Sequence, residues 1–303
     1  MMQAIRYHRY GGPEVLQLEH IARPIPQTGE VLIRVKAAGV LPVDWKIRKG
    51  LFKMPMQFPV IPGTAFAGVI EEVGPDVTEL FVGQEVFGRS TNGTYAEYTT
   101  APADSVAPKP SSIRFEEAAT ISGGATTAWC ALNNADVKAG DRVFIHGAAG
   151  GVGLFAVQFA KWKGANVVAT AGPENVAFIR SLGVDTVIDY TSSPFEAGLE
   201  GQMDFVLDTV GGGTLERSWQ LVRKGGTLLT ITGQPPIERG EQEGVRVIRS
   251  ALAERQDLFD IAELMDRGIV RTQIQAVYPL DKAQQAHSQS ETGHGRGRII
   301  IQP

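Results

Sequence analysis

The chain has 303 residues, which exceeds the usual size of one domain, so we expect two domains with substantial cores. Its formal net charge of −4, from 29 basic and 33 acidic residues, gives no reason to expect nucleic acid or an anionic membrane as the main ligand. The single cysteine, Cys130, excludes an intrachain disulfide and a multi-cysteine metal site.

Residues 1 to about 110 contain short β-prone runs separated by Gly and Pro, a pattern typical of a small irregular β-barrel. One short helix is predicted at about Pro42 to Arg48. The predicted strands are Gln3 to Tyr7, Val15 to Leu18, Glu30 to Ala38, Ala67 to Val73, Glu85 to Phe87 and Tyr95 to Thr100.

From Phe115 the pattern changes to a helical stretch, FEEAATISGGATTAWCALNNADV, and then to alternating strands and helices. Six parallel strands with intervening helices predict an α/β fold with a doubly wound, Rossmann-type sheet, whose ligand crevice lies at the carboxyl ends of the strands. The predicted strands are Val143 to Ile145, Asn166 to Thr170, Thr186 to Tyr190, Met203 to Leu207, Gly226 to Ile231 and Val245 to Ile248.

The last part of the chain predicts a helix near Leu252 to Arg267, a strand at Gln273 to Tyr278, a helix at Asp281 to Ser290 and a final strand at Arg298 to Ile301. Local pattern alone does not show on which domain this tail packs.

The stretch from Asp141 to Gly164, DRVFIHGAAGGVGLFAVQFAKWKG, predicts a strand, a glycine turn and a helix in direct succession. The turn matches the dinucleotide fingerprint G-x-G-x-x-G as Ala148-x-Gly150-x-x-Gly153, with alanine at the first position. Alanine is compatible with that position only if its φ is negative. Because helix-start N–H groups attract a pyrophosphate and glycines leave room for it, we expect a dinucleotide site here rather than an ordinary glycine-rich loop.

Six stretches, the glycine turn among them, occur in the order of a known family: Gly39 to Trp45, Arg48 to Phe52, Pro62 to Gly68, Gly93 to Tyr98, Thr126 to Trp129 and Ala148 to Gly153. Through them the chain resembles, from end to end, the zinc-independent quinone oxidoreductase (zeta-crystallin-like) branch of the medium-chain dehydrogenase/reductase superfamily. The resemblance implies a GroES-like barrel domain over residues 1–114, completed by residues 268–303, and a Rossmann domain over residues 115–267.

The chain departs from the zinc alcohol dehydrogenases of this superfamily. Those enzymes place a cysteine ligand where this chain has Leu41, and a His-Glu pair where it has Thr64-Ala65. A catalytic zinc needs about three protein ligands, so we expect none here. Each of the five histidines is more simply a surface or core imidazole than a metal ligand.

Without a metal, an alcohol lacks the Lewis acid that prepares it to lose hydride, whereas a quinone or enone accepts hydride directly. We therefore expect an NADPH-dependent reductase of quinones or related α,β-unsaturated carbonyls, which acts in the cleft between the two domains. One alternative is an enoyl-thioester or alkenal reductase. Another is a low-turnover NADPH-binding sensor or structural protein, which the glycine motif cannot distinguish from an enzyme.

The resemblance places the substrate pocket at Leu41, Trp45, Phe52 and Phe66. Some related quinone and enoyl reductases carry tyrosine where this chain has Phe52, which cannot donate a proton. If this position faces the substrate, the pocket favours quinones or aromatic enones over enoyl thioesters. Core packing explains Leu41 and Phe52 equally well.

Enzymes that select NAD normally carry an acid about 20 residues after the glycine motif, where it binds the ribose 2′-hydroxyl. Here Thr170-Ala171-Gly172-Pro173 has no carboxylate before Glu174, which favours NADPH. In the family a lysine and a tyrosine often hold the 2′-phosphate. The tyrosine matches Tyr190, but the lysine position is Val176.

Arg180 and Arg296 are candidate substitutes for that lysine, although either is also consistent with a solvated surface. The doubly wound geometry and the resemblance together predict the remaining coenzyme contacts. We expect Thr127 near the nicotinamide, Asp208 and Thr209 near its ribose, and Thr232 to Gln234 near the carboxamide. The full predicted set is Thr127, Ala149, Gly150, Gly151, Val152, Thr170, Gly172, Tyr190, Thr209, Thr232, Gly233 and Arg296.

Asp44 and Glu97 also match family positions, but we expect them to be structural, as acids that cap a turn and a strand. The N-terminus lacks the apolar core of a signal peptide, and no apolar run approaches the roughly 20 residues of a membrane span. These features predict a soluble, cytoplasmic protein with a small-molecule substrate. By analogy with relatives, Gly226 to Ile231 and the strand after it could join two subunits as a homodimer.

Overall fold

The computed structural model describes residues 1–52 and 56–303 and divides into two compact units. Unit 1 contains Met1–Gly123, Glu254–Arg267 and Thr272–Pro303, and unit 2 contains Gly124–Ala253 and Gly268–Arg271. These limits differ from the predicted domain boundaries at two helices and at Gly268–Arg271, which belong to unit 2. Helix α2 (Phe115–Ala118) packs on strands β3 and β4, and helix α8 (Arg255–Asp266) packs on strand β7, so both belong to unit 1.

Unit 1 is built around a seven-stranded sheet in the order β14-β15-β3-β4-β5-β7, with β6 also paired to β3, and a two-stranded β1-β2 sheet. Strand β3 is central because alternate residues Val31, Ile33 and Val35 are buried in one apolar core. The strands are β1 (Met2–Arg6), β2 (Gln17–Ile21), β3 (Glu30–Val40), β4 (Ala65–Val73), β5 (Glu85–Arg89), β6 (Tyr98–Pro102), β7 (Val106–Pro108), β14 (Ile274–Pro279) and β15 (Arg298–Gln302). The other helices are α1 (Pro42–Arg48) and α9 (Ala283–Glu291).

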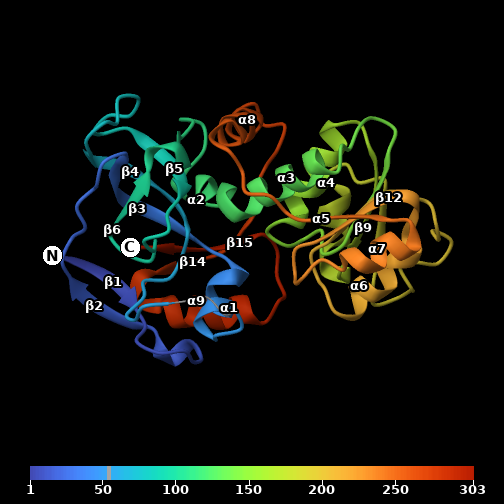
Figure 1. Ribbon diagram of the computed structural model, residues 1–303, viewed down its shortest axis with the longest axis horizontal. Coiled ribbons are helices and arrows are strands. Elements are labelled where there is room, and N and C mark those ends of the chain that lie inside the picture. Colours follow the sequence, from blue (N-terminus) through green and yellow to red (C-terminus); the bar gives the residue numbers. More distant parts are fainter. Residues whose placement is uncertain (53–55) are drawn as a thin grey trace. The chain divides into compact units, whose positions relative to one another are not determined.

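The C-terminal tail returns to the N-terminal part of the chain, as the resemblance implied. Strand β15 pairs antiparallel with β3, where Ile300 lies opposite Gly39, and parallel with β14. Helix α9 lies against α1, so red and blue ribbons meet in Figure 1. Unit 1 is therefore completed by residues from both ends of the sequence.

Unit 2 is a six-stranded, fully parallel sheet in the order β10-β9-β8-β11-β12-β13. This order confirms the doubly wound prediction and puts the reversal of strand order beside β8, where such sheets bind ligands. The strands are β8 (Arg142–Ile145), β9 (Asn166–Ala171), β10 (Thr186–Asp189), β11 (Met203–Asp208), β12 (Val222–Thr230) and β13 (Arg246–Ile248). The helices are α3 (Thr126–Asn134), α4 (Gly153–Trp162), α5 (Val176–Arg180), α6 (Gly213–Ser218) and α7 (Ile237–Glu243).

The predicted helical stretch that begins at Phe115 is wrong in its middle. Ser122 is extended, with φ −67° and ψ 128°, and Gly123 has a φ of +71°, so the helices α2 and α3 are separate. A Cβ at position 123 would lie 2.6 Å from Leu41 Cδ1, which requires glycine here for space as well as for φ. No helix within residues 1–52 and 56–303 has the length and apolar composition to cross a membrane.

Candidate functional site

The glycine turn connects β8 to α4 in unit 2, as predicted. The positive φ that the turn requires, +65°, occurs at Gly147, whereas Ala148 has no positive φ, so alanine is compatible with its place. A Cβ at Gly153 would lie 2.2 Å from the carbonyl oxygen of Gly147, whereas one at Gly150 would lie 3.3 Å from that atom and have no closer neighbour. Gly153 therefore allows close packing of helix and turn, and Gly150 borders open space.

Thr170 supports this turn from the end of β9. Its carbonyl oxygen accepts a hydrogen bond of 3.1 Å from the Ala148 N–H, and its Oγ1 accepts one of 3.3 Å from the Gly147 N–H. Thr170 is buried, and the turn closes on itself through the Gly150 N–H and the Gly147 carbonyl oxygen, 3.0 Å apart. The turn is thus held rigidly at the N-terminus of α4, whose dipole favours an anion there.

His146 lies directly beneath the turn, a role that sequence reasoning missed. Its Nε2 is 2.9 Å from Ser218 Oγ and its Nδ1 is 3.3 Å from Thr170 Oγ1. Because the Ser218 hydroxyl donates to the Thr214 carbonyl oxygen, Nε2 carries the proton and Nδ1 accepts. Burial lowers the pKa of His146 to about 4, so the ring is neutral and buttresses Thr170.

The ends of β11 and β12 lie at the same edge of the sheet. The Thr209 hydroxyl donates to the His146 carbonyl oxygen at 2.7 Å, and a Cβ on Gly147 would lie 2.5 Å from Thr209 Oγ1. Asp208 is buried and accepts from the Gly211 N–H and the Thr230 hydroxyl at 3.0 and 2.8 Å, which makes it a structural acid. The structure therefore brings Thr209, the glycine turn and Thr170 together.

The other predicted coenzyme residues of unit 2 are spread along this edge or beside it. Tyr190 follows β10, its N–H donates to the Ala171 carbonyl oxygen at 3.4 Å, and its side chain is 51% exposed. Thr232 Oγ1 lies 3.0 Å from Thr230 Oγ1. Ala149 and Gly172 are buried, Gly233 is exposed, and Thr127, Gly151 and Val152 are half-buried. Arg296 lies in unit 1, so its contact with coenzyme stays a prediction.

The predicted substrate residues all lie in unit 1, in different environments. Phe66 is fully buried within β4, which favours packing over substrate contact. Leu41 is buried against Gly123 at the junction of β3 and α1. Phe52 is 43% exposed, and Trp45 is half-buried with an indole Nε1 that has no hydrogen-bond partner within the described ranges.

A buried carboxylate fixes the corner that carries Leu41. Asp44 Oδ2 accepts from the Leu41 N–H at 2.8 Å and from the Tyr95 hydroxyl at 3.0 Å. The buried Arg298 donates to the carbonyl oxygens of Val40 and Gly123 at 3.4 and 3.3 Å. Asp44 is thus a structural cap, as predicted, and so is Glu97, whose carboxylate accepts from the Gln3 N–H at 2.7 Å.

The chain of contacts continues from Tyr95 to the surface. Arg48, fully buried, donates through NH1 to His287 Nδ1 at 3.0 Å, so His287 Nε2 carries the proton that reaches Tyr95 Oη at 3.2 Å. Arg48 also pairs with Glu291, which binds Lys49 at 2.6 Å. Sequence reasoning missed this network because its members lie far apart in the chain.

Two buried histidines and a buried aspartate are among the groups with strongly displaced pKa values. Burial and the nearby Arg48 cation lower the pKa of His287 to about 3. Burial lowers the pKa of His146 to about 4. Burial raises the pKa of Asp44 to about 7, despite its hydrogen bonds with Leu41 and Tyr95. The unfolded histidines take up protons near pH 6.5 and the folded ones do not, so stability falls as the pH falls below about 6.5. Asp44 affects the free energy of unfolding in the opposite direction. Its stabilising contribution is complete below about pH 4 and is lost as the pH rises through about 7.

We expect His287→Gln to make stability less sensitive to acid. Glutamine can accept from Arg48 and donate to Tyr95 without taking up a proton. Between pH 6.5 and 4.5 the free energy of unfolding should therefore fall less steeply than in the wild type, by about 1.4 kcal/mol per pH unit at most. Urea unfolding across this range measures the slope. An unchanged slope would show that His287 does not stay neutral in the folded protein.

The positions that bear zinc ligands in related alcohol dehydrogenases lie near one another. Gly39, two residues before Leu41, pairs with Ala65 across β3 and β4. Leucine and alanine provide no metal-binding atom. Within the described ranges no group of three or more His, Cys, Asp and Glu side chains is placed to hold a metal ion.

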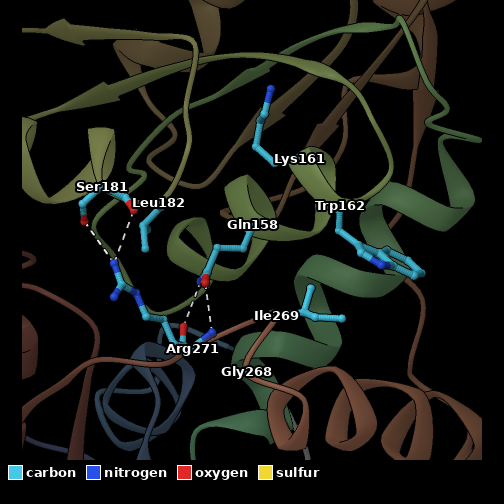
Figure 2. A pocket seen from close by; sticks show the side chains of 8 residues that line it. All are labelled: Gln158, Lys161, Trp162, Ser181, Leu182, Gly268, Ile269 and Arg271. Carbon is cyan, nitrogen blue, oxygen red and sulfur yellow. Dashed lines mark hydrogen bonds between the residues drawn. The ribbon is translucent and has the colours of Figure 1, made fainter.

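A cavity of about 290 Å³ lies at the other end of α4 from the glycine turn (Figure 2). Gln158 binds the Arg271 backbone there, with its Oε1 accepting from the N–H at 2.9 Å and its Nε2 donating to the carbonyl oxygen at 2.8 Å. Arg271 in turn donates to Ser181 Oγ at 3.1 Å. Because Lys161 and Trp162 of this cavity end the helix that Gly153 begins, the cavity is separate from the coenzyme edge.

The comparisons with known proteins agree with this arrangement. Residues 27–111 match the family described as Alcohol dehydrogenase GroES-like domain, and residues 182–301 match that described as Zinc-binding dehydrogenase. A quinone oxidoreductase from Sus scrofa is 36% identical over 98% of this chain and 95% of its own length. This chain belongs to the quinone oxidoreductase family of medium-chain dehydrogenases/reductases.

Two more members of the superfamily are similar along the whole chain. The 2-methylene-furan-3-one reductase of Solanum lycopersicum is 35% identical over 100% of this chain and 79% of its own length. The crystal structure of Escherichia coli quinone oxidoreductase complexed with NADPH is 29% identical, with a TM-score of 0.89 over 99% of this chain and 100% of that one. The Rossmann and GroES-like folds are thereby confirmed.

Proposed function

We propose that this family member is an NADPH-dependent reductase that transfers hydride to quinones or related α,β-unsaturated carbonyls without a catalytic zinc. The observation that carries the proposal is the rigid glycine turn at the N-terminus of α4, at the edge where a parallel sheet binds nucleotides. The NADPH complex of the similar Escherichia coli enzyme supports the choice of coenzyme.

The residues of unit 2 fit this coenzyme. Gly153 closes the turn against α4, while Gly150 leaves space on the other side, which is the arrangement that a pyrophosphate requires. Thr170, Gly172 and Tyr190 would then hold the adenosine ribose, and Thr209, Thr232 and Gly233 the nicotinamide half. Bound NADPH supplies the hydride, and the protein binds and orients both reactants.

The substrate class follows from the side chains at the zinc-ligand positions. Leu41 and Ala65 cannot hold a metal that would activate an alcohol, whereas quinones and enones spread the developing negative charge over their own oxygens. We propose that Leu41, Trp45 and Phe52 contact the substrate, and that water supplies the proton.

Stopped-flow oxidation of NADPH in chelator-treated protein tests this function. The acceptors are 1,4-benzoquinone, 9,10-phenanthrenequinone and 2-cyclohexenone. We expect rapid quinone reduction that the chelator does not affect. Coenzyme binding without turnover of any acceptor would contradict the proposal and favour a binding or structural protein.

We expect Phe52→Tyr to shift the preference toward enones, because a phenol at a position that faces the substrate can donate a proton. The kcat for 2-cyclohexenone should rise roughly tenfold, while the kcat for 1,4-benzoquinone stays within about twofold. Steady-state rates with both acceptors measure the change. Equal effects on both acceptors would mean that residue 52 does not donate to the substrate.

The cytoplasmic location, the homodimer and the assignment of residues 1–114 with 268–303 to a substrate domain stay predictions. For the dimer, sedimentation at micromolar concentration gives the decisive measurement, and a monomer alone would contradict it.

A further inference from the structure

The cavity at the C-terminal end of α4 is built entirely from unit 2 (Figure 2). Its walls are α4, the two residues after α5 and the segment Gly268–Arg271. Its volume of about 290 Å³ is close to the lower limit of roughly 300 Å³ for small-molecule pockets. Because α4 has ten residues, the cavity lies about 15 Å from the glycine turn, too far to share a ligand group with it.

The segment Gly268–Arg271 is held against α4 without any ligand. Gln158 is buried, and its amide binds both the N–H and the carbonyl oxygen of Arg271, at 2.9 and 2.8 Å. Its Nε2 also donates to the Leu154 carbonyl oxygen at 2.7 Å. Val270 is buried and anchors the same segment. The cavity is therefore preformed, which reduces the entropy lost when a ligand binds.

The charge of this cavity favours an anion. Its lining includes two cations, Lys161 and Arg271, and no acid. Lys161 Nζ lies 2.7 Å from Asp185 Oδ2, so this cation is already paired. Among the residues that the structure describes, Arg271 has no carboxylate within ion-pair distance. Arg271 is therefore the cation of this cavity that an anionic ligand would neutralise.

The guanidinium of Arg271 is oriented but only partly used. Its Nη2 donates to Ser181 Oγ at 3.1 Å and to the Ser181 carbonyl oxygen at 3.4 Å. Within residues 1–52 and 56–303 its Nε and Nη1 have no acceptor. A carboxylate forms strong, charge-assisted hydrogen bonds with such a planar donor set.

A second part of the cavity wall is apolar and uncovered. In Figure 2 Trp162 and Ile269 lie across Gln158 from the guanidinium. Trp162 is 48% exposed and Ile269 is 37% exposed. Trp162 stacks on Trp129, with ring centroids 5.8 Å apart, which fixes its indole. A flat aromatic body that covers these two side chains would remove apolar surface from water.

We propose that this cavity binds a small aromatic monocarboxylate. The carboxylate binds Arg271, and the ring lies against Trp162 and Ile269. A neutral quinone lacks the charge that Arg271 selects, so the site is distinct from that of the proposed substrate. The inference does not depend on the proposed function, because every residue that carries it lies apart from the coenzyme edge.

A ligand-observed NMR titration with 2-naphthoate tests the proposal. We expect a Kd of about 1 mM for the wild type, which is what about 13 non-hydrogen atoms give at a modest affinity per atom. The neutral 2-naphthamide has the same ring system without the charge and should bind at least about tenfold more weakly.

Two variants change opposite ends of the cavity. Arg271→Gln should weaken 2-naphthoate binding about tenfold, and the segment should stay in place because Gln158 binds only its backbone. Ile269→Glu should cause a similar loss, because it puts a like charge beside the ligand. The control is Arg267→Gln, which removes a positive charge from an exposed side chain four residues before Arg271 and should leave the Kd within about twofold. Thermal unfolding verifies that all three variants are folded.

A weakening of at least threefold by both cavity variants, with the control unchanged, supports the inference. No saturable binding up to about 10 mM, equal affinity for the neutral amide, or a smaller effect of Arg271→Gln overturns it. The titration is repeated with NADPH present. If NADPH displaces 2-naphthoate and Arg271→Gln has no effect, the carboxylate binds at the glycine turn, and the inference is also overturned.

Discussion

Gly153→Ala should greatly weaken coenzyme binding and destabilise unit 2. The new Cβ would lie 2.2 Å from the Gly147 carbonyl oxygen and 2.7 Å from the Ala148 Cα, both of them backbone atoms that cannot move alone. We expect a loss of roughly 3 kcal/mol in the free energy of unfolding and a weakening of NADPH binding by at least about a hundredfold, because helix and turn must separate.

Gly150→Ala is the matched control for this change. Its Cβ would meet only the Gly147 carbonyl oxygen, at 3.3 Å, so stability should change by less than about 1 kcal/mol while NADPH binding weakens. Denaturant unfolding and fluorescence titration of both variants give the two quantities. Normal NADPH binding by Gly153→Ala would mean that the close approach of α4 to the turn is not needed for the coenzyme site.

Arg48→Met should destabilise unit 1 by about 3 kcal/mol, because it removes a fully buried donor from several hydrogen-bonded partners. The guanidinium is fully buried and donates to His287, to Glu291 and to the Gly11 carbonyl oxygen. Methionine fills much of the space but leaves His287 Nδ1 and the Gly11 carbonyl oxygen without their donor, and it leaves Glu291 with Lys49 as its cation. Urea unfolding, with two-state behaviour checked by two probes, measures the loss.

Lys49→Met provides the comparison, since Lys49 binds the same Glu291 from a side chain that is 36% exposed. Exposed ion pairs contribute up to about 1 kcal/mol, so this variant should lose no more than that. Equal losses in the two variants would contradict the view that burial of Arg48 determines the strength of the network.

The sequence predicted the parts of this fold that depend on local chemistry. The helix at Pro42–Arg48 has the predicted bounds because proline is favoured at the first helical position. Five of the six parallel strands begin within three residues after a glycine, whereas β12 begins at Val222, four residues before the predicted Gly226. In contrast, the break at Gly123 depends on contact with Leu41, which no local pattern reports.

The site divides in the same way. The glycine turn was predictable because strand, turn and helix are contiguous in the sequence. The fingerprint also predicts what Gly150 and Gly153 do, namely leave space for the pyrophosphate and allow close packing of helix and turn. The link from Asp44 through Tyr95 to His287 was not, because it joins side chains from three separate parts of the chain. Glu174 was noted in the sequence, but only the structure shows its carboxylate over Gly172.

The pairing of β15 with β3 affects the order in which the two units can form. Every strand of unit 2 lies between Arg142 and Ile248, so its sheet is complete in the nascent chain before β15 has been synthesised. The end of β3 that leads to Leu41 stays unpaired on one side until Ile299–Ile301 have been synthesised. An unpaired strand edge is a template for association between chains. Loss of the last few residues would therefore leave the nucleotide-binding sheet intact while exposing an aggregation-prone edge beside the predicted substrate corner.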